Sequence, residues 1–263
     1  IIIYNGEIYN YKELKIELSS DYSFRTESDT EVILAAYNKW GKDCVNHFRG
    51  MFAFVLYDSK QEKIFCARDR FGIKPFYYYQ KNNQFYFASE VKALMPFMDE
   101  IKTNEEALNE YLYFQLGLGH DTLFENVNQL SPAHTLTITK GELKFEKYWE
   151  VYYDLDFTRT PKYFNEKLNE LMYESINYHT ESDVPIGAYV SGGIDSGIIA
   201  SVANKEKNMP DDLMAFTGKF ALGDLYDESF YAEKLAEKSN IKLLQKDITE
   251  QDFVDSINKV IYH

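Results

Sequence analysis

The stretch SGGIDS at residues 191–196 decides the fold of the second half of this chain. It lies between an apolar segment, residues 186–190, and a segment with helical character, residues 196–203. A glycine pair between a strand and a helix lets the backbone turn tightly and approach a ligand without an intervening Cβ atom. The N–H groups at the start of such a helix, together with the positive end of its dipole, attract an anion. The stretch therefore predicts a phosphate-type loop.

An ordinary turn between a strand and a helix is the alternative interpretation of this stretch, since a Gly-Gly pair alone is compatible with one. The remaining residues favour the anion site, because Ser191 and Ser196 supply hydroxyl donors and Asp195 is placed to hold a metal ion on phosphates. The GxxxxGK[ST] pattern of a Walker loop does not apply, since neither Lys42 nor Lys219 is followed by serine or threonine.

Strands and helices are predicted to alternate on both sides of this loop. Apolar residues at helical spacing predict a helix over residues 164–176. Further strands are predicted at residues 213–217 and 241–245, with helices over residues 227–238 and from residue 252. Such alternation is typical of an α/β domain with parallel strands and crossover helices on the faces of the sheet.

The first 150 residues contain short β-prone runs separated by turn residues. These runs are residues 1–4, 23–26, 51–57, 63–69, 76–79, 84–88, 135–139 and 143–149. A helix is predicted over residues 29–39, with Asp29 as its N-cap and Gly41 at its end. We expect an α+β domain of antiparallel sheets with helices packed on them. The polar segment 152–161 places the boundary between domains of residues 1–155 and 156–263.

Composition and charge exclude several classes of protein. The 263 residues carry a formal net charge of −14, which argues against binding to the phosphate backbone of nucleic acid. The longest strictly apolar run, residues 51–57, is far shorter than the roughly 20 residues that span a bilayer. Cys44 and Cys66 indicate neither a disulfide framework nor a CxxC metal site. We expect a cytoplasmic protein with no nucleic-acid or membrane partner, and we interpret both cysteines as core residues.

A second chemical pattern, Asn5-Gly6-Glu7, follows the first predicted strand. An Asn amide and a Gly N–H at a strand end can point at one oxygen, which is the arrangement of an oxyanion hole. Glu7 and Asp29 are suited to hold an ammonium group through charge-assisted hydrogen bonds. The alternative is a type I′ hairpin turn at Asn5-Gly6 with a solvated Glu7. The spacing alone leaves both interpretations open.

Five motifs of the first half resemble the glutaminase domain of glutamine-hydrolysing asparagine synthetases. They are NGEIYN (residues 5–10), TESDTE (26–31), RGMFAFVLYD (49–58), ARDRFGIKPFYY (67–78) and SEVKAL (89–94). The SGGIDS loop resembles the pyrophosphate-binding loop of the ATP pyrophosphatase (PP-loop) superfamily and lies where the synthetase domain of that family begins. The resemblance implies an Ntn-hydrolase-like α+β domain, with two antiparallel sheets between helices, followed by a truncated α/β PP-loop domain.

The resemblance also implies roles for individual residues. Asn5 and Gly6 would form the oxyanion hole, and Glu7 with Asp29 would hold the α-amino group of glutamine. The residues implied to contact ATP or its pyrophosphate are Val190, Ser191, Gly192, Gly193, Ile194, Asp195, Ser196 and Gly218. Position 218 is more commonly aliphatic in that family. Asp195 is the residue expected to hold Mg²⁺.

The activity implied by the resemblance is the ATP-dependent amidation of aspartate to asparagine. ATP would adenylate aspartate to β-aspartyl-AMP with release of pyrophosphate, and ammonia released from glutamine would arrive through an internal channel and displace AMP. The small-molecule substrates would be glutamine, aspartate and ATP, with Mg²⁺, and a homodimer is expected for the family. Two alternatives stay open. One is a relative that amidates another carboxylate, such as a sugar acid or a peptide, and the other is a non-catalytic ligand-sensing protein.

Both ends of the sequence depart from the pattern of the family. The chain opens on Ile1, whereas the family has a catalytic cysteine at its mature N-terminus, and it stops at His263, before the family's second conserved loop. We expect an internal fragment that lacks both ends and that is inactive as a glutaminase by itself, because that reaction needs a thiolate nucleophile. The pocket for the acceptor is expected to lie largely past His263.

Overall fold

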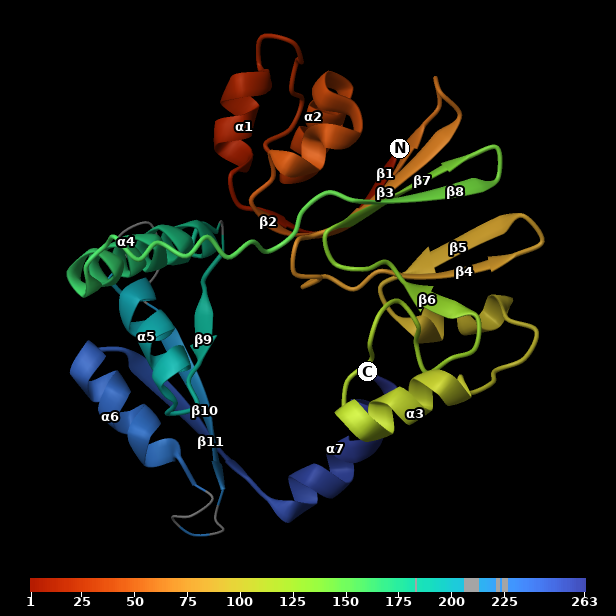
Figure 1. Ribbon diagram of the computed structural model, residues 1–263. Helices are drawn as coiled ribbons and strands as arrows, with labels where there is room; N and C mark the ends of the chain where they lie inside the picture. Colours follow the sequence, from red (N-terminus) through yellow and green to blue (C-terminus); the bar gives the residue numbers. More distant parts are fainter. Residues whose placement is uncertain (183, 206–212, 221–222, 224–226) are drawn as a thin grey trace. The chain divides into compact units, whose positions relative to one another are not determined.

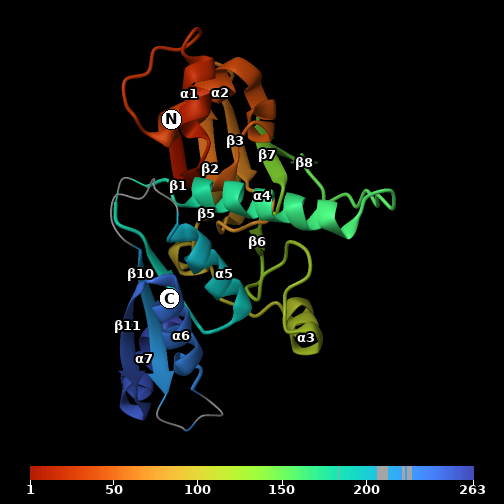
Figure 2. The same cartoon turned by 90° about the vertical axis from the view of Figure 1, so that its left-hand side faces the viewer.

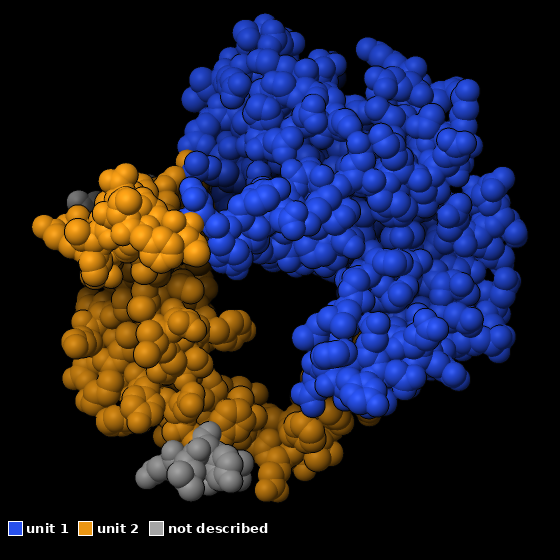
Figure 3. Space-filling view, viewed as in Figure 1, with its two compact units in different colours: residues 1–154 blue, residues 155–263 orange. Residues whose placement is uncertain are grey.

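The computed structural model describes residues 1–182, 184–205, 213–220, 223 and 227–263. Contacts between Cα atoms divide the chain into two units, Ile1–Asp154 and Leu155–His263, which Figure 3 colours separately. Within the described ranges, no helix has both the length and the apolar character needed to cross a membrane.

The first unit is built on a five-stranded antiparallel sheet with the strand order β1-β2-β3-β7-β8. Its strands are β1 (Ile2–Ile8), β2 (Gly50–Asp58), β3 (Lys63–Arg68), β7 (His134–Thr139) and β8 (Glu142–Lys147). The helices α1 (Tyr11–Leu18) and α2 (Asp29–Trp40) pack on one face of β1, β2 and β3 (Figure 1). Leu14, Leu18 and Val32 of these helices are buried in one cluster with Phe52 and Phe54 of β2.

A second, three-stranded antiparallel sheet packs against the opposite face of the first. Its strand order is β5-β4-β6, with β4 at Tyr77–Lys81, β5 at Gln84–Ala88 and β6 at Val127–Gln129. Alternation along β2 joins the layers, because Phe52 and Phe54 point to the helices while Ala53 and Val55 join Tyr78 in the cluster between the sheets. The remaining elements are α3 (Glu105–Phe114) and the 3₁₀ turns Gly41–Asn46, Val91–Ala93 and Met95–Phe97.

The second unit contains a parallel sheet with the strand order β11-β10-β9. Its elements are α4 (Pro161–His179), β9 (Gly187–Tyr189), α5 (Ile194–Ala203), β10 (Met214–Phe220), α6 (Ser229–Ser239), β11 (Lys242–Ile248) and α7 (Glu250–Tyr262). Figure 2 shows β10 and β11 side by side. Antiparallel sheets with helices in the first part and a parallel sheet in the second confirm the coarse fold class expected from the sequence.

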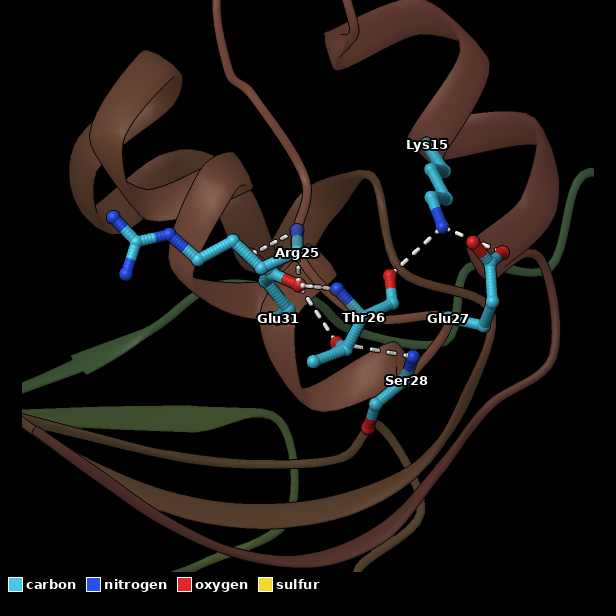
Figure 4. Close-up of polar contacts among 6 residues, drawn as sticks. All are labelled: Lys15, Arg25, Thr26, Glu27, Ser28 and Glu31. Carbon is cyan, nitrogen blue, oxygen red and sulfur yellow. Dashed lines mark hydrogen bonds and ion pairs between the residues drawn. The ribbon is translucent and has the colours of Figure 1, made fainter.

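The strand predicted at residues 23–26 is wrong, because a side chain satisfies its backbone. The Glu31 carboxylate accepts the N–H of Arg25 at 3.0 and 3.1 Å, the N–H of Thr26 at 2.7 Å and the Thr26 hydroxyl at 2.6 Å (Figure 4). Lys15 adds a hydrogen bond to the Thr26 carbonyl and an ion pair with Glu27. These contacts give the segment its hydrogen-bond partners without a neighbouring strand.

The N-cap of α2 also differs from the prediction. Ser28 caps the helix, since its hydroxyl accepts the N–H of Thr30 at 3.2 Å, and Asp29 is the first helical residue. Because Ser28 caps the helix, the Asp29 side chain does not, and it bonds to β1 instead. Gly41 ends the helix as predicted.

A buried carboxylate fixes the loop after β3. Asp69 is 1% exposed and accepts four backbone N–H groups at 3.0 to 3.2 Å. Its Oδ1 takes the N–H groups of Phe71 and Ile73, and its Oδ2 takes those of Phe52 and Lys74. Both oxygens therefore serve as acceptors, which only a carboxylate provides.

Asp69→Asn tests this assignment, because the asparagine amide turns one acceptor into a donor that faces two N–H groups. We expect the first unit to lose about 3 kcal/mol of stability, on the scale of hydrogen bonds to charged groups. Asp58→Asn is the matched control, since Asp58 accepts the N–H groups of Lys60 and Gln61 through Oδ1 alone, and an amide oxygen can replace it. Urea unfolding followed by tryptophan fluorescence reports on this unit, because Trp40 and Trp149 both lie in it. Equal unfolding midpoints for the two variants would contradict the assignment.

Candidate functional site

The free edge of β1 brings together several of the predicted site residues. β1 is an edge strand of its sheet within the described residues, and it pairs only with β2 there. Tyr9 donates its N–H to Arg49 and Tyr57 donates to Ile1, so odd-numbered residues bond to β2. The alternation of an antiparallel ladder therefore directs the N–H groups of Gly6 and Ile8 to the outer edge. The hairpin turn considered for Asn5-Gly6 is wrong, since both residues lie inside the strand.

Asp29 occupies this edge. Its Oδ2 accepts the Ile8 N–H at 3.1 Å and the Tyr4 hydroxyl at 2.7 Å. Tyr4 packs against the core cluster beneath α2. Burial raises the pKa of the Tyr4 hydroxyl far above its ordinary value, and its hydrogen bond to Asp29 and the charges of Asp29 and Glu7 raise it further. Asp29 therefore places a carboxylate at the edge of β1, and the charge of Glu7 also acts on the Tyr4 hydroxyl.

Asn5 points elsewhere. Its side-chain Nδ2 donates to the Ser89 hydroxyl at 3.2 Å, just after β5 of the second sheet. Both residues line a cavity of about 310 Å³ between the sheets, whose other walls include the apolar residues Ala53, Val55 and Phe87. Sequence reasoning did not identify Ser89 or Tyr4, although each lies within or beside a recognised motif.

Gly6 is required by a close approach of two strands. A Cβ atom at Gly6 would lie 2.2 Å from the Met51 carbonyl oxygen and 2.7 Å from the Phe52 Cα atom. Both atoms belong to the backbone of β2, so a side chain at this position would force the strands apart. Gly6 consequently has no side chain beside its outward N–H group.

The SGGIDS loop joins the end of β9 to the start of α5. Val190 is buried, and its N–H donates to Phe216 of β10 at 2.9 Å, which extends the parallel pairing. Gly193 is the N-cap, and the first intrahelical bond runs from Gly197 N–H to its carbonyl at 3.1 Å. The N–H groups of the first turn have no partner four residues earlier in the helix. Ile194 is 78% exposed, so this turn is open to solvent.

Two serines brace the loop. The hydroxyls of Ser191 and Ser196 lie 3.2 Å apart, and the Ser196 hydroxyl accepts the N–H of Ser191 at 3.3 Å. Ser196 also donates to the carbonyl of Gly193 at 3.3 Å, across the first turn of α5. The contacts keep the loop closed over the start of the helix, with both hydroxyls beside the helix N-terminus.

Gly192 has a left-handed backbone, with φ +87°, which favours glycine. A Cβ atom there would lie 2.8 Å from the Glu228 carbonyl oxygen and 2.9 Å from the Tyr231 Cβ atom. The loop therefore rests directly on the start of α6. No other residue type fits this position without a shift of the backbone.

Gly218 lies at the same edge of the sheet as the loop. Phe216 pairs with Tyr189 and accepts the N–H of Val190, and Gly218 follows two residues later, toward the carboxyl end of β10. A Cβ atom at Gly218 would lie 2.6 Å from the Cδ1 atom of Ile248 on β11. Ile248 thus occupies the space that an aliphatic side chain at position 218 would need. The carboxyl ends of parallel strands form the usual ligand crevice of such sheets.

Asp195 stands in the first turn of α5 and is exposed. Among the residues that the structure describes, no group of three or more His, Cys, Asp and Glu side chains is arranged to hold a metal ion. A single carboxylate fits Mg²⁺ bound mainly through substrate phosphates and water, which is how Mg²⁺ commonly binds with nucleotides. The donor set therefore suits a nucleotide-borne ion rather than a protein cage.

The two cysteines are core residues, as predicted. Cys44 and Cys66 are both 0% exposed. Burial raises the pKa of the Cys44 thiol to about 12 and raises that of Cys66 well above its usual range. Neither thiol is suited to act as a nucleophile, because the reactive form is the thiolate.

Two protein families match consecutive parts of this chain. Residues 1–149 match the glutamine amidotransferase domain family, and residues 167–263 match the asparagine synthase family. The chain belongs to the glutamine amidotransferase domain family and continues into an asparagine synthase region. The resemblance expected from the sequence motifs is thereby confirmed.

Several curated relatives align with nearly the whole chain. Glutamine-hydrolyzing asparagine synthetase 1 of Bacillus subtilis is 38% identical over 264 residues, which cover 100% of this chain and 41% of that protein. Glutamine-hydrolyzing asparagine synthetase 3 of the same organism is 32% identical over 99% of this chain and 44% of that protein. An amidase of Gibberella zeae is 30% identical over 89% of this chain and 37% of that protein. The chain spans less than half the length of each of these relatives.

The burial of both thiols predicts slow modification of the native protein. At pH 8 a thiol with a pKa of about 12 is almost entirely protonated, so we expect Cys44 and Cys66 to react with Ellman's reagent only after unfolding. The measurement is the thiol count of the 263-residue chain in buffer and in concentrated urea, with two reactive thiols expected in urea. Rapid reaction of either thiol in buffer would contradict the burial described above.

Proposed function

We propose that this chain is the glutaminase domain and the beginning of the ATP-binding domain of an enzyme that amidates aspartate with ammonia from glutamine. The first unit would hydrolyse glutamine in an Ntn-type site. The second unit would bind ATP in a PP-loop, where aspartate becomes β-aspartyl-AMP with release of pyrophosphate. Ammonia then attacks the acyl carbon, and AMP leaves to give asparagine.

The edge of β1 supports the glutaminase role. The outward N–H of Gly6 is a fixed donor for the oxyanion that forms when a nucleophile attacks the side-chain carbonyl of glutamine. The Asn5 amide donates one N–H to Ser89, and its other N–H is proposed as the second donor. Asp29 and Glu7 supply negative charge for the α-ammonium group. Because Cys44 and Cys66 are buried, neither is proposed as the nucleophile.

The observation that carries the ATP-binding role is the glycine-rich start of α5. Gly192 and Gly193 bring the backbone, without side chains, to the positive end of a helix at the carboxyl edge of a parallel sheet, and among the described residues only a long 3.4 Å contact to the Ser191 hydroxyl engages the Gly193 N–H. A pyrophosphate group bound there would accept hydrogen bonds from the first turn and from Ser191 and Ser196. Asp195 would hold Mg²⁺ on the phosphates, and the ion would offset negative charge that develops on the leaving pyrophosphate.

A carboxylate other than aspartate is a second candidate for the acceptor, because a relative named as an amidase matches most of the chain at 30% identity. An enzyme with the same two domains could amidate another carboxylate, such as a sugar acid or a peptide. Incubation of the full-length gene product with labelled glutamine, ATP and a panel of carboxylic acids separates the candidates. We expect asparagine from aspartate and no labelled product from the other acids.

Asp195→Ala in the full-length gene product tests the assignment of the two sites. We expect aspartate-dependent exchange between ATP and pyrophosphate to fall by about 100-fold, because the group that holds the ion on the phosphates is lost. Glutamine hydrolysis should stay within about twofold of wild type, since its proposed residues lie in the other unit.

Glu106→Ala is the matched control for that variant. Glu106 is likewise an exposed acidic residue in the first turn of a helix, α3, and lies in neither proposed site. It should leave both reactions unchanged. Equal losses of both reactions in Asp195→Ala would overturn the assignment of ATP to the loop at residues 191–196.

A further inference from the structure

We infer that Tyr4 is a positioning residue for glutamine binding, because its hydroxyl holds the Asp29 carboxylate in the orientation that receives the α-ammonium group. The inference rests on the proposed glutaminase function of the first unit. Three features of the structure carry it: the contact itself, the space that Gly6 leaves for the tyrosine ring, and the bracing of the segment that presents Asp29.

The hydrogen bond between Tyr4 and Asp29 gives the two oxygens of the Asp29 carboxylate different surroundings. Oδ2 of Asp29 accepts both the Tyr4 hydroxyl at 2.7 Å and the Ile8 N–H at 3.1 Å. Oδ1 is approached by the hydroxyls of Ser28 and Thr30 at 3.5 Å, a distance at which a hydrogen bond is weak. Two good donors therefore occupy one oxygen, and the other retains its capacity for a charged donor.

The absence of a side chain at Gly6 leaves space for the ring of Tyr4. Tyr4, Gly6 and Ile8 alternate to the same face of β1, and a Cβ atom at Gly6 would lie 3.0 Å from the Cε2 atom of Tyr4. The ring lies over the bare glycine and reaches the carboxylate that also binds Ile8. Gly6 thus serves two purposes, because it presents an open backbone N–H and clears the way for the Tyr4 hydroxyl.

The segment before α2 is braced from within the protein. Glu31 binds the backbone of Arg25 and Thr26 (Figure 4). Ser28 also caps the helix, so the first turn of α2 is held in place. The backbone of Asp29 is therefore fixed, and the remaining freedom is rotation of its side chain. The Tyr4 hydroxyl restricts that rotation together with the Ile8 N–H, and it makes the shorter of the two hydrogen bonds. Since burial keeps this hydroxyl protonated, it acts as a donor throughout the working pH range.

Tyr4→Phe in the full-length gene product tests the inference, with glutamine hydrolysis and ammonia-dependent synthesis as the two readouts. We expect KM for glutamine to rise about tenfold, on the scale of one charge-assisted hydrogen bond, while kcat stays within about twofold. Ammonia-dependent synthesis should be unchanged, because it does not use glutamine. Tyr57→Phe is the control, since this partly exposed tyrosine of β2 belongs to the same sheet but lies away from Asp29.

A double-mutant cycle separates positioning from a general structural effect. In an Asp29→Ala background, Tyr4→Phe should change KM by less than about twofold, because the hydroxyl has nothing left to orient. A wild-type KM in Tyr4→Phe, or an equal rise in both backgrounds, would overturn the inference and leave the proposed function standing. Absence of glutamine hydrolysis in the wild-type enzyme would instead overturn the proposed function, and the inference with it.

Discussion

Both candidate sites depend on one physical constraint, which is that a backbone segment passes closer to its neighbour than a Cβ atom allows. At Gly6 the neighbour is the backbone of β2, and at Gly192 it is the start of α6. Only glycine meets this condition without moving a strand or a helix. In both proposed sites, the glycine leaves the backbone without a side chain in front of the ligand that is proposed to bind there. The two glycines therefore link the packing of each unit to its proposed chemistry.

The same constraint would let an acidic protein bind the anion proposed for the second unit. With a net charge of −14, the chain has no general attraction for phosphate. Backbone N–H groups and the dipole of α5 provide a local positive field that does not depend on lysine or arginine. The proposed glutamine site uses the opposite sign, because Asp29 and Glu7 offer carboxylates to an ammonium group while Gly6 serves an oxyanion. Each unit thus carries the local charge that its proposed ligand requires.

Periodicity and turn chemistry predicted most of the fold, and the failures have identifiable causes. The strand at residues 84–88 was predictable because its β-prone run follows the turn residues Asn82 and Asn83. The alternating elements around the SGGIDS loop were predictable because hydrophobic pattern and glycine agree there. Residues 23–26 were wrongly predicted as a strand because their β-prone pattern does not show that the Glu31 carboxylate accepts their N–H groups. The Asn5-Gly6 pair has the composition of a turn, yet close strand packing keeps it extended. The partnership of Tyr4 with Asp29 joins residues 25 positions apart, which local sequence patterns do not reveal.

We expect the helix start at residues 191–196 to bind the pyrophosphate that ATP releases. A crystal structure of the full-length gene product with ATP and Mg²⁺ can locate the phosphates. Their oxygens should lie about 2.7–3.2 Å from the first-turn N–H groups of α5, with the hydroxyls of Ser191 and Ser196 as further donors. A triphosphate bound elsewhere, with this helix start facing only water, would contradict it.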